Sequence, residues 1–241
     1  MYDLTRLGQS LEESLANDKL TEMITDLGDI TLDQLAETGE SLPIFSIISK
    51  SIKAYNSVRD HFFMEKVICY LTEIATISPE LRLKAIQRIA EDPKYGVKFG
   101  KKILNIIDRL DDDIKAFYLA KAYRYLADGQ ITLEFYLRLG TMLDSMYLAN
   151  IETLQTNWIS LCAHPTNCVF ETLGLARQSF RIFDVKNPGK SINAEKYKVV
   201  YQPGYRFTDT GRVVNNIFTG KPIHYMSGYK TIEEFNMRVK Y

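Results

Sequence analysis

Apolar residues recur at helical spacing along most of the first 150 positions of the chain. Residues 8–40 carry a weak apolar stripe that is interrupted near Asn17-Asp18, which predicts short helices, and Thr31 with Gln34 forms a capping box for another. Residues 42–76 have a much denser pattern of apolar side chains at helical spacing, which residues 59–61 interrupt. This density predicts one or two helices that are buried in a core.

A helix lying on a membrane surface is the alternative interpretation of residues 42–58. Lys50 and Lys53 would then lie at the interface between lipid and water, as basic residues of such helices do. The remainder of the polar face is thin and uncharged, so burial in a protein core is favoured.

Helix-capping residues divide the next stretch into four predicted helices. The N-terminal signals are Ser78-Pro79, Asp92-Pro93, Asp111 and Thr132, and Asp128-Gly129 is a stop signal. The predicted helices cover residues 79–90, 94–109, 112–127 and 133–149. Short turns join them, so we expect neighbouring helices to pack as antiparallel pairs in a bundle.

After residue 150 the pattern changes and strand-forming residues appear. The predicted elements are helices at 151–161 and 168–183, a strand at 196–201, a turn at Pro203-Gly204, a returning strand at 205–207 and a helix at 210–218. Thr208 or Asp209 caps the last of these helices, and Gly220 ends it. A second capping box, Thr231 with Glu234, predicts a short terminal helix.

The amino-acid composition is typical of a soluble globular protein. Hydrophobic residues make up 46% and charged residues 25% of its 241 positions. No apolar run reaches the ~18 residues of a membrane-spanning helix, and the first residues do not form a secretory signal. Three cysteines do not make a disulfide framework, so a reducing, cytoplasmic location is expected.

The formal net charge of zero conceals two charged ends. Residues 1–40 contain ten acidic and two basic side chains, a net charge of −8, whereas residues 175–241 contain twelve basic and five acidic ones, a net charge of +7. The favoured interpretation is that both ends are solvated faces. Alternatively, the two ends could attract each other, or each could attract a separate partner.

The basic end supplies the candidate nucleic-acid-binding residues. Aromatic side chains are interleaved with the basic ones, and Arg177 and Arg181 share a face of the helix predicted at 168–183. Basic groups neutralise phosphates, and aromatic rings stack on unpaired bases. The candidates are Arg177, Arg181, Lys186, Lys196, Lys198, Arg206 and Arg212. The alternative is that the aromatic residues form a core and the basic ones keep the surface soluble.

For the other candidate metal and nucleotide sites, a purely structural role of the residues is favoured. Cys162, His164 and Cys168 lie within seven residues, but the spacing is unusual for zinc and no fourth ligand follows nearby. The run 111–113 of three aspartates could hold magnesium, but it lies where acids would complement a helix N-terminus. Glycine loops that bind nucleotides do not occur in the sequence. No catalytic residue, metal or cofactor is therefore predicted.

Residues 61–148 resemble the helical domain of tellurite-resistance-type (TerB-like) proteins. The resemblance is carried by residues 114–135, in which a helix, an Ala127-Asp128-Gly129 turn, Ile131 and the start of a further helix follow one another. Family members carry acidic, metal-associated positions, and no matching acidic cluster occurs in this sequence. The resemblance implies a helical bundle.

A second resemblance covers about residues 150–220. Two helices, the second containing the run 171–176, then a two-stranded wing and the run 205–211 resemble winged-helix domains. Phe207, Thr208 and Gly211 fit the exit of the wing, whereas Thr210 replaces the customary leucine. Such domains bind DNA through their second helix or bind only protein.

The predicted fold is therefore mainly α: a helical bundle with a small C-terminal α+β module that is winged-helix-like. The expected domains are an acidic helical arm over 1–41, the bundle over 42–149, and the basic module with a C-terminal tail over 150–241.

The leading functional hypothesis is a non-enzymatic adaptor whose bundle binds a protein partner and whose basic module binds nucleic acid or a second protein. The resemblances imply an origin in a bacterium or its phage and a role in a multi-component system such as antiviral defence. Two alternatives stay open: a membrane-associating effector that uses residues 42–58, and an enzyme whose site has no recognisable motif. The sequence does not indicate the oligomeric state.

Overall fold

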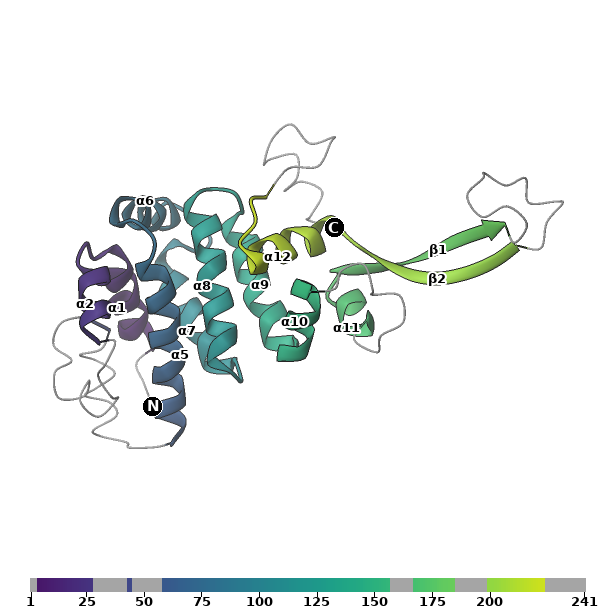
Figure 1. Ribbon diagram of the computed structural model, residues 1–241. Coiled ribbons are helices and arrows are strands. Elements are labelled where there is room, and N and C mark those ends of the chain that lie inside the picture. Colours follow the sequence, from purple (N-terminus) through teal and green to yellow (C-terminus); the bar gives the residue numbers. More distant parts are fainter. Residues whose placement is uncertain (1–3, 28–42, 45–57, 157–166, 185–198, 224–241) are drawn as a thin grey trace. The chain divides into compact units, whose positions relative to one another are not determined.

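Helices and one long β-hairpin make up the part of the chain that the structure describes (Figure 1). The computed structural model describes residues 4–27, 43–44, 58–156, 167–184 and 199–223. These residues are mostly helical, with a two-stranded antiparallel sheet towards the C-terminal end. The predicted fold class, mainly α with a small α+β part, is confirmed.

The chain divides into two compact units. Unit 1 contains Met1–Ser145 and unit 2 is Met146–Ile223. The boundary lies four residues before the one predicted at 149, and the first two helices belong to unit 1 rather than to a separate arm over 1–41.

Unit 1 is helical throughout its described residues. Its elements are α1 (Leu4–Ala16), α2 (Leu20–Leu27), α5 (Val58–Ala75), α6 (Pro79–Ala90), a 3₁₀ turn (Gly96–Lys98), α7 (Phe99–Arg109), α8 (Asp113–Ala127) and α9 (Leu133–Ser145). The interruption predicted near residues 17–18 is the break between α1 and α2. Gly129, with a φ of 73°, makes the turn between α8 and α9 that Asp128-Gly129 predicts.

The acidic N-terminal segment packs into unit 1 through one face of α1. Leu7, Leu11 and Leu15 are fully buried on that face. The backbones of α1 and α7 approach closely, since a Cβ atom added to Gly8 would lie 2.5 Å from the amide nitrogen of Lys101. The charged face of α1 still contributes one contact, because the carboxylate of Glu12 accepts a hydrogen bond from an amide in the first turn of α7.

Tyrosine side chains fill much of the centre of unit 1. The hydroxyl groups of Tyr70 on α5 and Tyr136 on α9 lie 2.9 Å apart in a buried hydrogen bond. The ring of Tyr123 on α8 packs edge-on against Tyr136, with 6.1 Å between ring centroids. Within the described residues the buried hydroxyl of Tyr123 has no hydrogen-bond partner.

Cationic side chains close the C-terminal ends of α7 and α8. The last carbonyl groups of a helix lack intrahelical donors and carry partial negative charge, so they attract cations. The ammonium group of Lys66 on α5 donates to the carbonyl oxygens of Asp108 at 2.9 Å and Leu110 at 2.6 Å, where α7 ends. Arg88 on α6 donates to the carbonyl oxygen of Leu126 at the end of α8.

Arg82 on α6 closes the end of α1 in the same way, and it is completely buried. Its Nε donates to the carbonyl oxygen of Leu15 at 3.2 Å, and its Nη2 donates to that of Asn17 at 2.7 Å. Its Nη1 donates to the carbonyl oxygen of Ile77 at 2.8 Å. Among the described residues no carboxylate forms a salt bridge with this guanidinium, so backbone carbonyl groups surround the buried charge.

Two helix starts in unit 1 differ from the sequence prediction. Residues 59–61 were expected to interrupt a helix but lie inside α5, where Arg59 pairs with Asp108 of α7 at 2.7 Å. Asp92 was expected to begin a helix. Instead, its carboxylate accepts hydrogen bonds from the amides of residues 94 and 95, in a turn just before the 3₁₀ turn. Helix α7 begins only at Phe99.

The boundary between the helices predicted at 133–149 and 151–161 lies earlier in the structure. Helix α9 ends at Ser145, and α10 (Leu148–Thr156) begins where the Asn150 side chain accepts a hydrogen bond from the Tyr147 amide at 2.8 Å. Phe62 and Ile114, which the apolar periodicity directs toward the core, are 59% and 47% exposed.

Unit 2 combines short helices with the hairpin. It contains α10, α11 (Asn167–Thr172), β1 (Ala176–Asp184), β2 (Val199–Phe207) and α12 (Asp209–Thr219). The strands pair in antiparallel register over nine residue pairs. Within unit 2 the ribbon of β1 and β2 extends away from the three helices (Figure 1).

The helix predicted at 168–183 is wrong beyond residue 172. Gly174, with a φ of 71°, ends α11, and the following residues alternate in the way that suits a strand. The turn predicted at Pro203-Gly204 is also wrong, because β2 runs straight through it and pairs Pro203 with Phe180. A strand of a two-stranded ribbon has one unpaired edge, which tolerates the missing N–H of proline.

Several sequence predictions lie outside the described residues. They are the helix after Thr31, most of the apolar segment 42–58, residues Cys162 and His164, and the terminal helix after Thr231. Ile44 is described, and it is fully buried. Across the described ranges, none of the helices combines the length and apolar character needed to cross a membrane.

Candidate nucleic-acid interface

Thr208, which the sequence predicts to cap a helix, also stabilises the base of the ribbon. The hydroxyl of Thr208 accepts the amide of Gly211 at 3.0 Å and so caps α12, as predicted. The same hydroxyl donates to the carbonyl oxygen of Gly174 at 2.6 Å, and the Thr208 amide donates to that of Leu175 at 3.0 Å. One residue therefore ties the end of β2 to the start of β1.

Gly211 makes this junction compact. A Cβ atom added there would lie 1.9 Å from the carbonyl oxygen of Leu175, so only glycine fits between α12 and the chain entering β1. The first pair of the ribbon, Ala176 with Phe207, is buried at this junction.

The next pair of the ribbon places two arginines directly opposite each other. Arg177 pairs with Arg206, and both side chains are exposed. Directly opposed residues of an antiparallel pair have Cβ atoms about 4.5–5.5 Å apart, and like charges in such a pair are destabilising. In the described part of the chain neither guanidinium has an ion-pair partner. An anion with several oxygen atoms, such as a phosphate, would relieve this repulsion by binding both.

We call the face of the ribbon that carries Arg177 and Arg206 the basic face. Gln178, the next residue of β1, lies on the opposite face, because successive residues of a strand alternate between its two faces.

The structure places the other candidate residues as follows. Arg181 lies on β1, where its backbone pairs with Gln202, so the element that carries Arg177 and Arg181 is a strand rather than the predicted helix. Arg212 is exposed on α12, in the first turns after Thr208. Lys186, Lys196 and Lys198 lie outside the described residues.

The pairing of Arg177 with Arg206 is the feature that the sequence analysis missed. The pairing depends on the register of two strands, and a helix predicted at 168–183 leaves no strand there to pair. The signal available was the alternation of polar and apolar residues from Ser179 to Ile182, which has the period of a strand.

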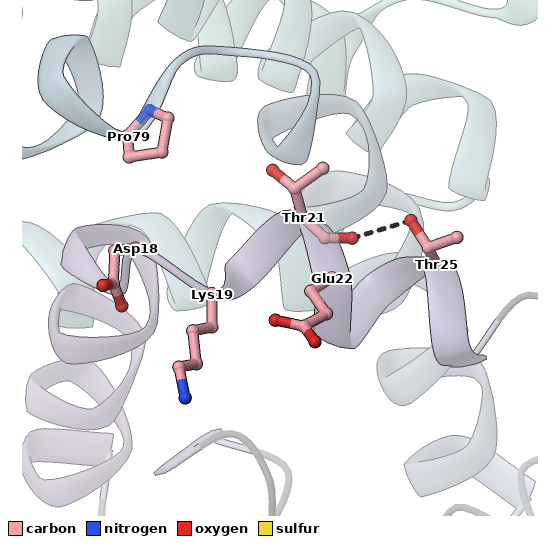
Figure 2. A pocket seen from close by; sticks show the side chains of 6 residues that line it. All are labelled: Asp18, Lys19, Thr21, Glu22, Thr25 and Pro79. Atoms are coloured by element: carbon pink, nitrogen blue, oxygen red, sulfur yellow. Dashed lines mark hydrogen bonds between the residues drawn. The ribbon is translucent and has the colours of Figure 1, made fainter.

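A hollow beside α2 is a second candidate site, but its chemistry is unremarkable. Figure 2 shows its lining, which consists of Asp18, Lys19, Thr21, Glu22, Thr25 and Pro79 around a volume of about 570 Å³. The hydroxyl of Thr25 donates to the carbonyl oxygen of Thr21 at 2.7 Å, and the hydroxyl of Thr21 donates to that of Ala75 at 2.7 Å. Both hydroxyl groups therefore already donate to backbone carbonyl oxygens.

The aspartate run 111–113 acts as a helix cap, as the sequence analysis favoured. The capping residue is Asp112 rather than Asp111, with its carboxylate accepting the amide of Ile114 at 2.8 Å. Asp111 instead forms an ion pair with Lys115 at 2.6 Å. No group of three or more potential metal ligands gathers within the residues that the structure describes.

The described cysteine Cys69 is not an activated nucleophile. Burial raises the pKa of its thiol to about 11, and the carboxylate of Asp113 acts in the same direction. Because the thiolate is the reactive form, this thiol stays protonated at neutral pH.

Comparison of the chain with protein-family models, with curated proteins and with solved structures found no match. The resemblances to tellurite-resistance-type bundles and to winged-helix domains remain predictions.

Proposed function

We propose that the protein is a non-enzymatic adaptor that binds nucleic acid through the basic face of its β-ribbon. The observation that supports this most directly is the Arg177–Arg206 pair, which opposes two exposed guanidinium groups without a carboxylate between them. The surplus of positive charge in residues 175–241 would add attraction over a longer range.

The dimensions of the ribbon favour duplex DNA as the ligand. Nine residues in a strand span about 27–30 Å at about 3.3 Å per residue. The DNA major groove is about 12 Å wide and admits a two-stranded ribbon.

The test is binding of the full-length protein to labelled duplex and single-stranded DNA across a series of salt concentrations. Each phosphate contact contributes about −0.9 to the slope of log affinity against log salt on duplex DNA. The double variant Arg177→Ala/Arg206→Ala should flatten this slope by about two units and weaken binding about equally across sequences.

A matched control removes the same charge from unit 1. Arg59→Ala/Arg109→Ala deletes two exposed arginines that form surface ion pairs with Asp108 and Asp144. It should leave the affinity and the slope unchanged. If wild-type protein binds neither DNA form at low salt, or if both double variants weaken binding equally, the proposed interface is wrong.

A further inference from the structure

A hollow lies where α5 and α8 begin, on unit 1. The two helices run parallel there. Lys66 in the middle of α5 donates to the carbonyl oxygen of Leu110 just before α8, and Thr76 just past the end of α5 accepts a hydrogen bond from Arg124 near the end of α8. The hollow has a volume of about 440 Å³ and is lined by Phe62, Glu65, Lys66, Leu110, Asp111, Asp112 and Asp113.

The charge lining this hollow is predominantly negative and only partly compensated. Asp111 is paired with Lys115, and the ammonium group of Lys66 is held by two backbone carbonyl oxygens. Glu65 and Asp113 are exposed, and no cation of the described residues forms a salt bridge with either. These two carboxylates are therefore available to a cation from outside.

Apolar side chains border the same carboxylates. Phe62 lines the hollow and is 59% exposed, and Val58, one helical turn earlier on the same face of α5, is 71% exposed. Ile114, which directly follows Asp113, is 47% exposed. Large apolar side chains gathered beside unpaired charges are typical of protein-binding surfaces.

We propose that this surface docks a short basic, amphipathic segment of a partner protein. Lysine or arginine side chains of the segment pair with Glu65 and Asp113, and its apolar side chains cover Phe62 and Val58. Charge complementarity selects this occupant, since an acidic or purely apolar segment would leave the carboxylates desolvated and unpaired. The proposal gives the adaptor's second binding site a location and does not depend on the ribbon.

The probe is a labelled amphipathic peptide with lysines on one face and leucines on the other, titrated with the full-length protein. A peptide in which glutamates replace the lysines is the matched probe of opposite charge. The wild-type protein should bind the lysine peptide, more weakly as salt is added, and should not bind the glutamate peptide.

Two variants locate the binding on the protein. Phe62→Ser should weaken it at least about tenfold, the scale of losing an interface anchor, and Glu65→Gln/Asp113→Asn should weaken it and remove much of its salt dependence. Leu83→Ser is the control, because Leu83 is 44% exposed on α6 and does not line the hollow. Unchanged urea unfolding midpoints would show that the variants remain folded.

Three results would overturn the proposal. The first is that the wild-type protein does not bind the lysine peptide, and the second is that Leu83→Ser weakens binding as much as Phe62→Ser does. The third is that the protein forms a dimer which Phe62→Ser dissociates, because the surface would then be an interface between copies of this chain. DNA binding by Phe62→Ser should match that of the wild type, so this proposal and the ribbon interface can fail separately.

Discussion

Replacing Arg82 by alanine should destabilise unit 1 more than any exposed charge substitution. The change removes the donors for the carbonyl oxygens of Leu15, Asn17 and Ile77, and the side chain that it truncates is completely buried. An unsatisfied buried polar group costs about 1–3 kcal/mol. Water entering the vacated space would satisfy some of these groups, so we expect a loss of about 3–5 kcal/mol in the free energy of unfolding.

The assay is urea unfolding followed by circular dichroism, which reports mainly on the helices. Since small domains are stable by only about 5–15 kcal/mol, the unfolding midpoint of Arg82→Ala should fall markedly. Arg82→Lys should be intermediate, because an ammonium group retains the charge but not the planar fork that reaches three carbonyl groups.

Arg109→Ala provides the comparison for a surface arginine. Its ion pair with Asp144 is largely exposed, and such pairs contribute about 0–1 kcal/mol. If Arg82→Ala loses no more stability than Arg109→Ala, then the carbonyl contacts of Arg82 do not stabilise the end of α1 and the reasoning is refuted.

The remaining predictions concern a half-buried carboxylate and two buried tyrosines of unit 1. Burial raises the pKa of Glu12 above 4.5 despite the hydrogen bond from the Gly100 amide at 2.6 Å, so the folded state loses stability as the pH rises through this range. Glu12→Gln, which keeps an acceptor, should therefore be more stable than wild type at pH 7 in urea unfolding, with the advantage vanishing well below pH 4.5; an advantage independent of pH would contradict this. Tyr123→Phe should change the melting temperature little because it removes an unpartnered hydroxyl, whereas Tyr136→Phe breaks a buried hydrogen bond and should cost about 1 kcal/mol; equal effects would contradict the assignment.

Helices bounded by capping residues were predictable from the sequence. Ser78 with Pro79, Thr132 and Thr208 each begin a helix in the structure, because their side chains accept amides that no helical carbonyl can reach. Asp92 carries the same signal, yet it closes only a turn. A local cap cannot determine whether a helix will follow it, since that depends on the packing of later residues.

The ribbon was harder to predict because strand pairing is not local. The run from Arg177 to Phe183 satisfies both a helical and a strand interpretation, and only its pairing with residues 200–206 decides between them. The sequence analysis grouped Arg177 with Arg181 on one helical face, whereas the cross-strand partner of Arg177 depends on the register of the two strands. Exposure at the α5–α8 hollow was missed for a similar reason: periodicity places Phe62 and Ile114 toward a core without showing where that core ends.

The closure of α1 by Arg82 has a consequence for the synthesis of the chain. The two residues joined by the Arg82–Leu15 hydrogen bond are 67 positions apart in the sequence. At about 5–20 residues per second, the ribosome adds Arg82 roughly 3–13 s after Leu15. Helix α1 therefore leaves the ribosome before α6, and its C-terminal carbonyl groups remain without their donor until α6 has also emerged. The completion of α1 thus depends on the synthesis of a later helix and not only on its own residues.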